Sequence, residues 1–67
     1  MAISARNQLK GTVKSVSVGE VMAEVLIDVG GQEVVAAITR HSVENLGIKK
    51  GDAVTAVIKA TEVMVMK

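Results

Sequence analysis

Several residue types are missing from this 67-residue chain, and each absence excludes a class of site. Without cysteine the chain has no disulfides, thiolate metal ligands or cysteine nucleophiles. Without phenylalanine, tryptophan or tyrosine it lacks the aromatic rings on which proteins that bind single-stranded nucleic acids stack the bases. Its single histidine is too few for a metal site with the usual four ligands.

An excess of one charge is also lacking. Eight lysines and arginines stand against seven aspartates and glutamates, a net charge of +1, whereas proteins that bind nucleic acids usually carry a basic excess. No apolar run approaches the ~20 residues that a membrane span needs. The first residues lack the apolar core of a secretory signal. Composition therefore predicts a cytoplasmic protein whose partners are neither nucleic acids nor membranes.

What remains is a small apolar chain that is expected to fold as one domain over residues 1–67. Apolar residues make up 49% of the sequence, and the mean hydropathy of +0.42 is high for a domain of this size. Domains this small are usually stabilised by disulfides, a metal or subunit contacts. Since the composition leaves subunit contacts, the sequence predicts a homo-oligomer.

Branched aliphatic residues dominate the apolar set, with 13 valines and 5 isoleucines against 3 leucines. Because β-branched side chains favour pleated sheets, most of the chain is expected to be strand. The apolar positions change phase between Val13 and Val16, which predicts a bulge or sharp bend in the first strand. Gly30 and Gly31 suit a tight hairpin. The expected strands cover residues 7–18, 21–29, 32–38, 53–59 and 61–66.

Residues 39–47 break the strand pattern and predict a short helix. Thr39 or Ser42 can cap its start, and Gly47 suits the left-handed position that ends a helix. Five short strands, with a helical turn between the third and the fourth, follow the element order of an OB-fold barrel. The expected fold is therefore all-β, an OB-fold-like five-stranded barrel with one short helix between strands 3 and 4.

No arrangement of residues is typical of catalysis. His41 and Glu44 are three residues apart on the expected helix, but two ligands do not close a metal site, and a solvated helix face is the simpler interpretation. No serine is set in a nucleophile elbow, and the seven carboxylates are spread singly along the chain. The sequence predicts a protein that is not an enzyme and that holds no metal directly.

Hydrogen-bond donors are concentrated between Ser4 and Lys10. This segment holds a hydroxyl, a guanidinium, two amides and an ammonium, with no acidic residue nearby. Ser4 and Arg6 point to the same side of an extended chain, and such a set suits a tetrahedral oxyanion. The competing interpretation is a solvated strand start in which Arg6 pairs with a surface carboxylate, an arrangement that is common.

Two further groups of donors follow in the sequence. Residues 39–42, Thr-Arg-His-Ser, stand at the expected helix start, where free backbone N–H groups and the helix dipole favour anions. An interpretation in which these hydroxyls act only as caps is at least as good. Lys59 ends an apolar strand, and a lone lysine there is ordinarily a surface residue whose charge reaches into solvent.

The motif Ser-Ala-Arg-Asn-Gln-Leu-Lys-Gly at residues 4–11 closely resembles the opening signature of the molbindins. These are small cytoplasmic proteins with a TOBE-type domain that bind molybdate and tungstate. Residues 56–64, Ala-Val-Ile-Lys-Ala-Thr-Glu-Val-Met, and the stretch from Ile38 to Gly47 also fit, so the resemblance covers essentially the whole chain. It implies an OB-like barrel of five strands, assembled as a hexamer (a trimer of dimers) with oxyanion sites between subunits.

The resemblance also implies an oxyanion site built from two subunits. One subunit supplies a hydroxyl, two cationic side chains and two backbone N–H groups, which correspond to Ser4, Arg6, Lys59 and the N–H groups near Ala5 and Ala60. The neighbouring subunit supplies hydroxyls that correspond to Thr39 and Ser42. Family members bind a second kind of site near the threefold axis, whose ligands the side chains here do not identify. Arg40 and His41 match no family feature.

The donor set suits molybdate for a chemical reason. Molybdate at neutral pH is a dianion without a proton, so it only accepts hydrogen bonds, whereas hydrogen phosphate would bring an unpaired P–OH group at a cost of ~1–3 kcal/mol. The functional prediction is binding of molybdate and tungstate at subunit interfaces for intracellular molybdate storage. The alternatives are a structural oligomerisation module and an OB-type binding module, both without affinity for oxyanions.

Overall fold

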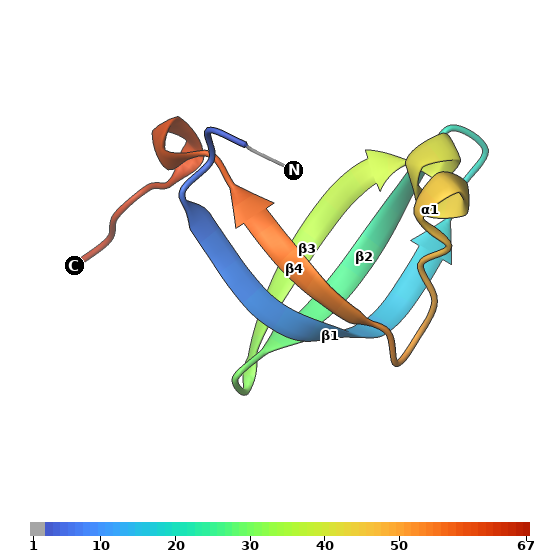
Figure 1. The fold of residues 1–67 in the computed structure, drawn as a ribbon, viewed down its shortest axis with the longest axis horizontal. Coiled ribbons are helices and arrows are strands. Elements are labelled where there is room, and N and C mark those ends of the chain that lie inside the picture. Colours follow the sequence, from blue (N-terminus) through green and yellow to red (C-terminus); the bar gives the residue numbers. More distant parts are fainter. Residues whose placement is uncertain (1–2) are drawn as a thin grey trace.

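The computed structural model describes residues 3–67, which form an antiparallel sheet with one α-helix and one 3-10 helix (Figure 1). The elements in chain order are β1 (Asn7–Val18), β2 (Met22–Val29), β3 (Gln32–Thr39), α1 (Arg40–Leu46), β4 (Ala53–Ile58) and η1 (Ala60–Glu62). The mostly β class is therefore confirmed, together with the short helix between the third and fourth strands.

β1 organises the sheet, whose strand order is β3-β2-β1-β4. Its residues 7–12 pair with β4, and its residues 12–18 pair with β2, all in antiparallel register. Because these two ladders overlap only at Thr12, the sheet is strongly staggered. In Figure 1 β1 curves from one end of the molecule to the other, and its two ends lie beside different parts of the chain.

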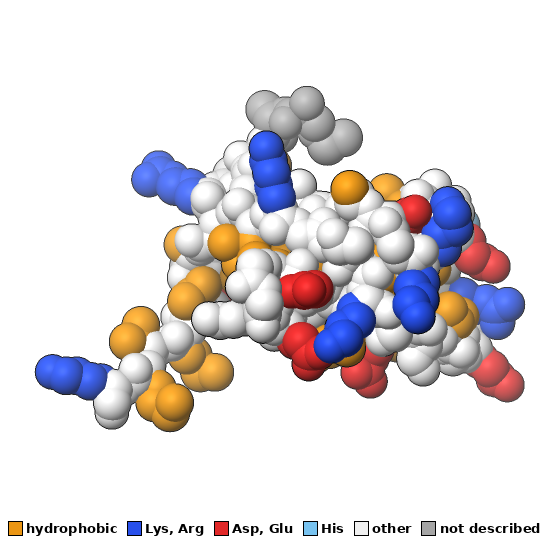
Figure 2. Space-filling view, turned by 90° about the horizontal axis from the view of Figure 1, so that it is seen from below, with side chains coloured by type: hydrophobic (Ala, Val, Ile, Leu, Met, Phe, Trp, Pro, Cys, Tyr) orange, Lys and Arg blue, Asp and Glu red, His pale blue; other side chains and the backbone are white. Residues whose placement is uncertain are grey.

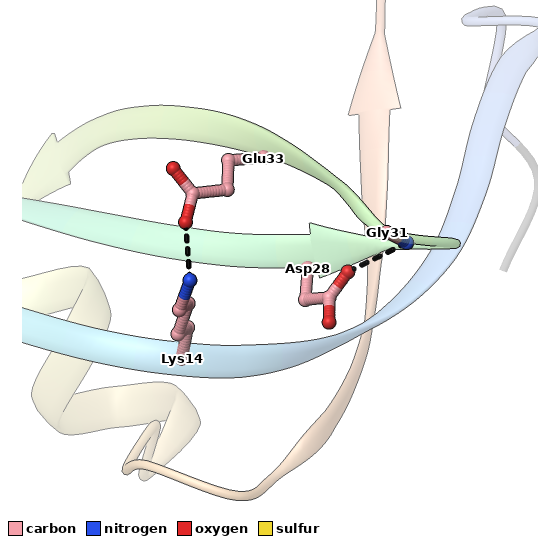
Figure 3. A network of polar contacts seen from close by, with 4 residues as sticks. All are labelled: Lys14, Asp28, Gly31 and Glu33. Atoms are coloured by element: carbon pink, nitrogen blue, oxygen red, sulfur yellow. Dashed lines mark hydrogen bonds and ion pairs between the residues drawn. The ribbon is translucent and has the colours of Figure 1, made fainter.

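The predicted irregularity in β1 is confirmed as a bulge. The pairing register with β2 shifts between Val13 and Ser15, which makes Lys14 the extra residue. The Lys14 ammonium reaches across β2 to the Glu33 carboxylate on β3 (Figure 3). The hydrogen bond to Glu33 and the attraction of its charge raise the pKa of Lys14. Since both side chains are about half exposed, this ion pair contributes little to the free energy of folding.

The predicted turns and caps are also confirmed. Gly30 and Gly31, with φ of 60° and 88°, form the hairpin between β2 and β3. Thr39, not Ser42, is the N-cap of α1, and Gly47 ends this helix with φ of 63° in the left-handed region. Neither helix within residues 3–67 is long and apolar enough to cross a membrane.

The core is small and consists of aliphatic side chains. Alternate residues of β2 are buried, and Val43 is the buried residue of α1 that packs against them. The buried cluster is completed from β1 and β4, so that its members are Val13, Ala23, Val25, Ile27, Val43 and Ala56. Twelve large apolar residues of the described chain are exposed, which fits the predicted need for subunit contacts.

The predicted fifth strand over residues 61–66 is wrong for the single chain. Residues 60–62 form η1, in which the Glu62 N–H donates to the Lys59 carbonyl at 2.9 Å, and residues 63–67 have no regular structure. A strand needs a neighbour with which its backbone can pair, and η1 turns the chain away from the sheet (Figure 1). Within the described residues the barrel is therefore not closed between β3 and β4.

The other strand boundaries differ by a single residue from those expected. β2 begins at Met22 instead of Val21, β3 extends to Thr39, and β4 ends at Ile58.

Gly11 is expected to be essential for the bend of β1. A Cβ at this position would lie 2.5 Å from the Asp28 carbonyl oxygen and 2.8 Å from Ile27 Cγ2. Because backbone atoms cannot give way as a flexible side chain can, Gly11→Ala should lower the free energy of unfolding by about 3 kcal/mol. Gly30→Ala is the control, since it meets open space and costs only about 1 kcal/mol for its positive φ. Urea unfolding at one protein concentration measures both, and equal losses would contradict the account.

Candidate functional site

The N-terminal donor segment is anchored near its start, at Ala5. Ala5 is buried, with 9% of its surface exposed, while its neighbours Ser4 and Arg6 are exposed. Gln8 Nε2 donates to the Ala5 carbonyl at 3.1 Å, which fixes the backbone just before β1. The hydroxyl and the guanidinium are therefore offered to solvent from an anchored backbone.

Lys59 and Ala60 lie beside this segment because β1 and β4 are antiparallel. The ladder ends with Asn7 opposite Ile58, so the chain leaving β4 passes the chain entering β1. Asn7 Nδ2 donates to the Ile58 carbonyl at 3.2 Å and closes this end of the sheet. The structure thus brings together the five residues predicted for one side of the site, which we call the cationic group: Ser4, Ala5, Arg6, Lys59 and Ala60.

The two positive charges of the cationic group are not neutralised within the described chain. The ion pairs among residues 3–67 are Lys14–Glu33, Arg40–Glu44 and Lys49–Asp52. Neither Arg6 nor Lys59 takes part, and both are exposed. The competing interpretation expected Arg6 to pair with a surface carboxylate, and residues 3–67 form no such ion pair. Two uncompensated cations beside a hydroxyl can hold an anion.

Thr39 and Ser42 form a pair of hydroxyls at the start of α1, which we call the hydroxyl group. Thr39 Oγ1 donates to Ser42 Oγ at 2.8 Å and accepts from the Ser42 N–H at 3.0 Å. The capping interpretation is therefore confirmed for Thr39. In this arrangement the hydrogen of the Ser42 hydroxyl is still available to an acceptor outside the chain. Capping and ligand binding are thus compatible at this pair.

The rest of the helix start offers less to an anion than the sequence suggested. The Arg40 N–H donates to the Val21 carbonyl at 2.8 Å, and Arg40 Nε lies 3.6 Å from Glu44 Oε2. The Arg40 N–H is therefore not free to bind an anion, and the Arg40 guanidinium is partly neutralised by Glu44. His41 and Glu44 are exposed, and among residues 3–67 no three His, Asp or Glu side chains are grouped so as to hold a metal ion.

The cationic group and the hydroxyl group lie at opposite ends of β1. The cationic group stands where β1 begins, next to the end of β4. The hydroxyl group follows β3, whose Thr39 pairs with Met22 of β2, next to the end of β1. Figure 1 shows this separation, with η1 at the left and α1 at the right. A single chain therefore does not unite all the predicted site residues.

Two amides that looked like ligand donors in the sequence have a different role. The side chains of Asn7 and Gln8 donate to backbone carbonyls of the same chain, so they position the cationic group. Sequence inspection could not separate these roles because an amide is the same donor in both. For Asn7, the pairing of β1 with β4 is the information that was missing.

Comparison with known proteins agrees with these observations. The family model described as "TOBE domain" matches residues 3–65. "Molybdenum-pterin-binding protein 3" of Clostridium pasteurianum is 52% identical over 67 residues, which cover 98% of each chain. The chain is thus similar over its whole length to a curated protein of the same size.

Solved structures share the fold as well. A molybdate-binding protein from Sporomusa ovata is 52% identical, matches over 100% of both chains and has a TM-score of 0.96. The cytoplasmic molybdate-binding protein ModG, solved with molybdate bound, is 46% identical with a TM-score of 0.85, covering 90% of this chain and 43% of that one. The family model and these relatives together establish that the chain belongs to the TOBE domain family.

Proposed function

We propose that this protein binds molybdate, and also tungstate, at sites shared between copies of the chain. The observation that carries the proposal is the cationic group, in which Arg6 and Lys59 flank an exposed hydroxyl and have no carboxylate partner among residues 3–67. Structural relatives that bind molybdate, one of them solved with the ion, support the choice of ligand. The second member of each site is the hydroxyl group of another copy.

The chemistry of the two groups explains the choice among tetrahedral anions. Guanidinium, ammonium, hydroxyl and backbone N–H groups all donate hydrogen bonds, and molybdate accepts on all four of its oxygens. Hydrogen phosphate brings a P–OH group for which the site has no carboxylate, and a P–OH group left without an acceptor costs ~1–3 kcal/mol. Tungstate matches molybdate in charge and nearly in size, so the site accepts both. Sulfate carries the same charge, and only the size of the cavity discriminates against it.

Two positive charges make partial burial of a dianion feasible. An uncompensated charge is costly to remove from water, and Arg6 with Lys59 supplies the opposite charge in full. Because each site needs two copies, the ion binds only the oligomer and stabilises it by mass action. The proposed assembly is a hexamer formed as a trimer of dimers, with a second kind of site near its threefold axis.

The proposed role is storage and buffering of molybdate in the cytoplasm, without catalysis. The relatives are named as binding proteins, and one of them as cytoplasmic. A site that satisfies every oxygen of its ligand and presents no nucleophile or base holds the ion unchanged. Residues 1–67 form the single unit that does this.

Calorimetric titration tests the ligand directly. Molybdate and tungstate should each release or absorb heat with a saturable isotherm, and phosphate at the same concentration should give none, because of its unmet P–OH group. A protein without affinity for oxyanions, such as a purely structural oligomerisation module, would give no heat with any of the three. Equal affinity for phosphate would contradict the donor-only site.

Removal of one cation should weaken binding without unfolding the protein. Arg6→Ala deletes a charged, exposed donor, so molybdate affinity should fall by about 2 kcal/mol, or roughly 30-fold, with little change in stability. Lys50→Ala, which removes an equal charge from an exposed turn, should leave the affinity within a factor of about two. Similar losses from the two variants would show that only net charge matters.

A mixing experiment tests whether the sites are shared. Arg6→Ala damages the cationic group, and Ser42→Ala damages the hydroxyl group. Each variant alone should bind molybdate weakly. When the two chains are unfolded together and reassembled, some sites should combine an intact Arg6 from one chain with an intact Ser42 from the other, and tight binding should partly return. If each site lay within one chain, the mixture would bind no better than the variants separately.

A further inference from the structure

A pocket with several charged side chains lies at the hydroxyl group. It has a volume of about 490 Å³, and Thr39 and Val21 form part of its wall. The rest of its lining consists of four ionisable residues, which we call the charged rim: Glu20, Arg40, His41 and Glu44. Because Thr39 is hydrogen-bonded to Ser42, the charged rim lies beside both hydroxyls that the proposed site uses.

The charged rim combines two segments that the backbone holds together. The Arg40 N–H donates to the Val21 carbonyl at 2.8 Å, which fixes the turn between β1 and β2 against the start of α1. Glu20 belongs to this turn. Glu44 lies one helical turn beyond Arg40, with Arg40 Nε 3.6 Å from Glu44 Oε2. The fold of the backbone therefore sets the positions of these four residues.

The charged rim and the cationic group differ in the sign of their charge. Glu20 and Glu44 contribute two negative charges and Arg40 one positive charge, so the rim has a net charge of −1 when His41 is neutral. Figure 2 shows acidic and basic side chains mixed over the end of the molecule that carries α1, at the right of both views. A dianion between the two groups is attracted by the cationic group and repelled by the charged rim.

We propose that the charged rim adjusts how tightly the oxyanion is held, and that protonation of His41 strengthens the binding. This inference rests on the proposed function, since it concerns the anion proposed to bind Thr39 and Ser42. Histidine is the side chain whose charge ordinarily changes between pH 5 and 8, and His41 is the single histidine of the chain. When its ring gains a proton, the net charge of the rim rises from −1 to zero, and the dianion is no longer repelled.

The expected size of the effect follows from charge and distance. His41 adjoins Ser42 in the chain, so their Cα atoms are ~3.8 Å apart, and an anion at Ser42 lies within a Debye length (~10 Å at 0.1 M salt) of the rim. One unit charge at such a distance from a dianion changes its affinity about threefold. The effect is modest because the four side chains of the rim are exposed to solvent.

Substitutions that change the charge of the rim at constant pH provide the first test. Glu44→Gln removes a negative charge and releases Arg40 from its ion pair, so molybdate affinity should rise about threefold. Arg40→Gln should lower it by a similar factor. Glu33→Gln is the matched control, since it makes the same chemical change at the opposite end of β3 from Thr39, and it should leave the affinity nearly unchanged. Calorimetric titration at low salt measures all four proteins, and equal affinities of the Glu44 and Arg40 variants would overturn the inference.

The pH dependence of binding provides the second test, which a purely structural role of His41 would not affect. Molybdate affinity of the unchanged protein should rise about twofold from near pH 7.5 to near pH 6, and His41→Gln should remove most of this rise. By linkage, binding near pH 6.5 should take up protons, so the heat of binding should depend on the ionisation heat of the buffer in the unchanged protein and much less in the variant. A rise of equal size in both proteins, or no rise in the unchanged protein, would overturn the role of His41.

Failure of this inference is distinguishable from failure of the proposed function. A protein that binds no molybdate at any pH would contradict both. A protein that binds molybdate with one affinity, whatever the charge of the rim and whatever the pH, would overturn the charged rim alone.

Discussion

The pairing of β1 with two different strands determines where the proposed ligand groups of a single chain lie. β1 is twelve residues long, pairs with β4 at its start and with β2 at its end, and so places the cationic group and the hydroxyl group at opposite ends of the molecule. The bulge at Lys14 interrupts the register of this strand with β2, and Gly11 lets its backbone approach β2 closely. The strand order also leaves β3 and β4 at the two edges with an apolar cleft between them. Within one chain the cationic group and the hydroxyl group therefore stay apart, and the apolar cleft stays open.

The chain exposes two kinds of surface that a partner can satisfy. One is apolar, and the other consists of hydrogen-bond donors and positive charge. Apolar surface drives association without regard to direction, and in the proposed assembly it is what brings the copies together. Hydrogen-bond donors and positive charge are directional, and they decide what is held once the copies have joined. Arg6 and Lys59 are exposed and lack carboxylate partners within residues 3–67, so the chain keeps two positive charges that an anion can neutralise. In the proposed site, the lack of a nearby carboxylate favours an anion that carries no proton.

Much of this arrangement could be predicted from the residues. The phase change between Val13 and Val16 predicted the bulge, Gly30 and Gly31 the hairpin, and Thr39 with Gly47 the limits of α1. These signals are local, because each depends on the conformational preference of a few neighbouring residues. The donor segment was also visible, since Ser4, Arg6 and Lys10 lie close together in the sequence.

What could not be predicted depends on contacts between distant residues. Residues 61–66 are rich in apolar side chains and include two valines, but whether a strand forms depends on an edge that is within reach, and η1 turns the segment away from its own sheet. Asn7 looked like a ligand donor because nothing local shows that its amide meets the Ile58 carbonyl at the end of β4. The distance between Thr39 and the cationic group likewise follows from strand pairing, which a short motif does not contain.

The central claim is that the ion is held between copies, and native mass spectrometry tests it most directly. Spectra recorded with and without molybdate report the number of chains and the number of bound ions in the same particle. The account predicts molybdate on oligomers, with monomer ions free of it, and a larger fraction of oligomer when the ion is present. Monomers that carry molybdate as often as the oligomers do, or oligomers that never carry it, would contradict the account.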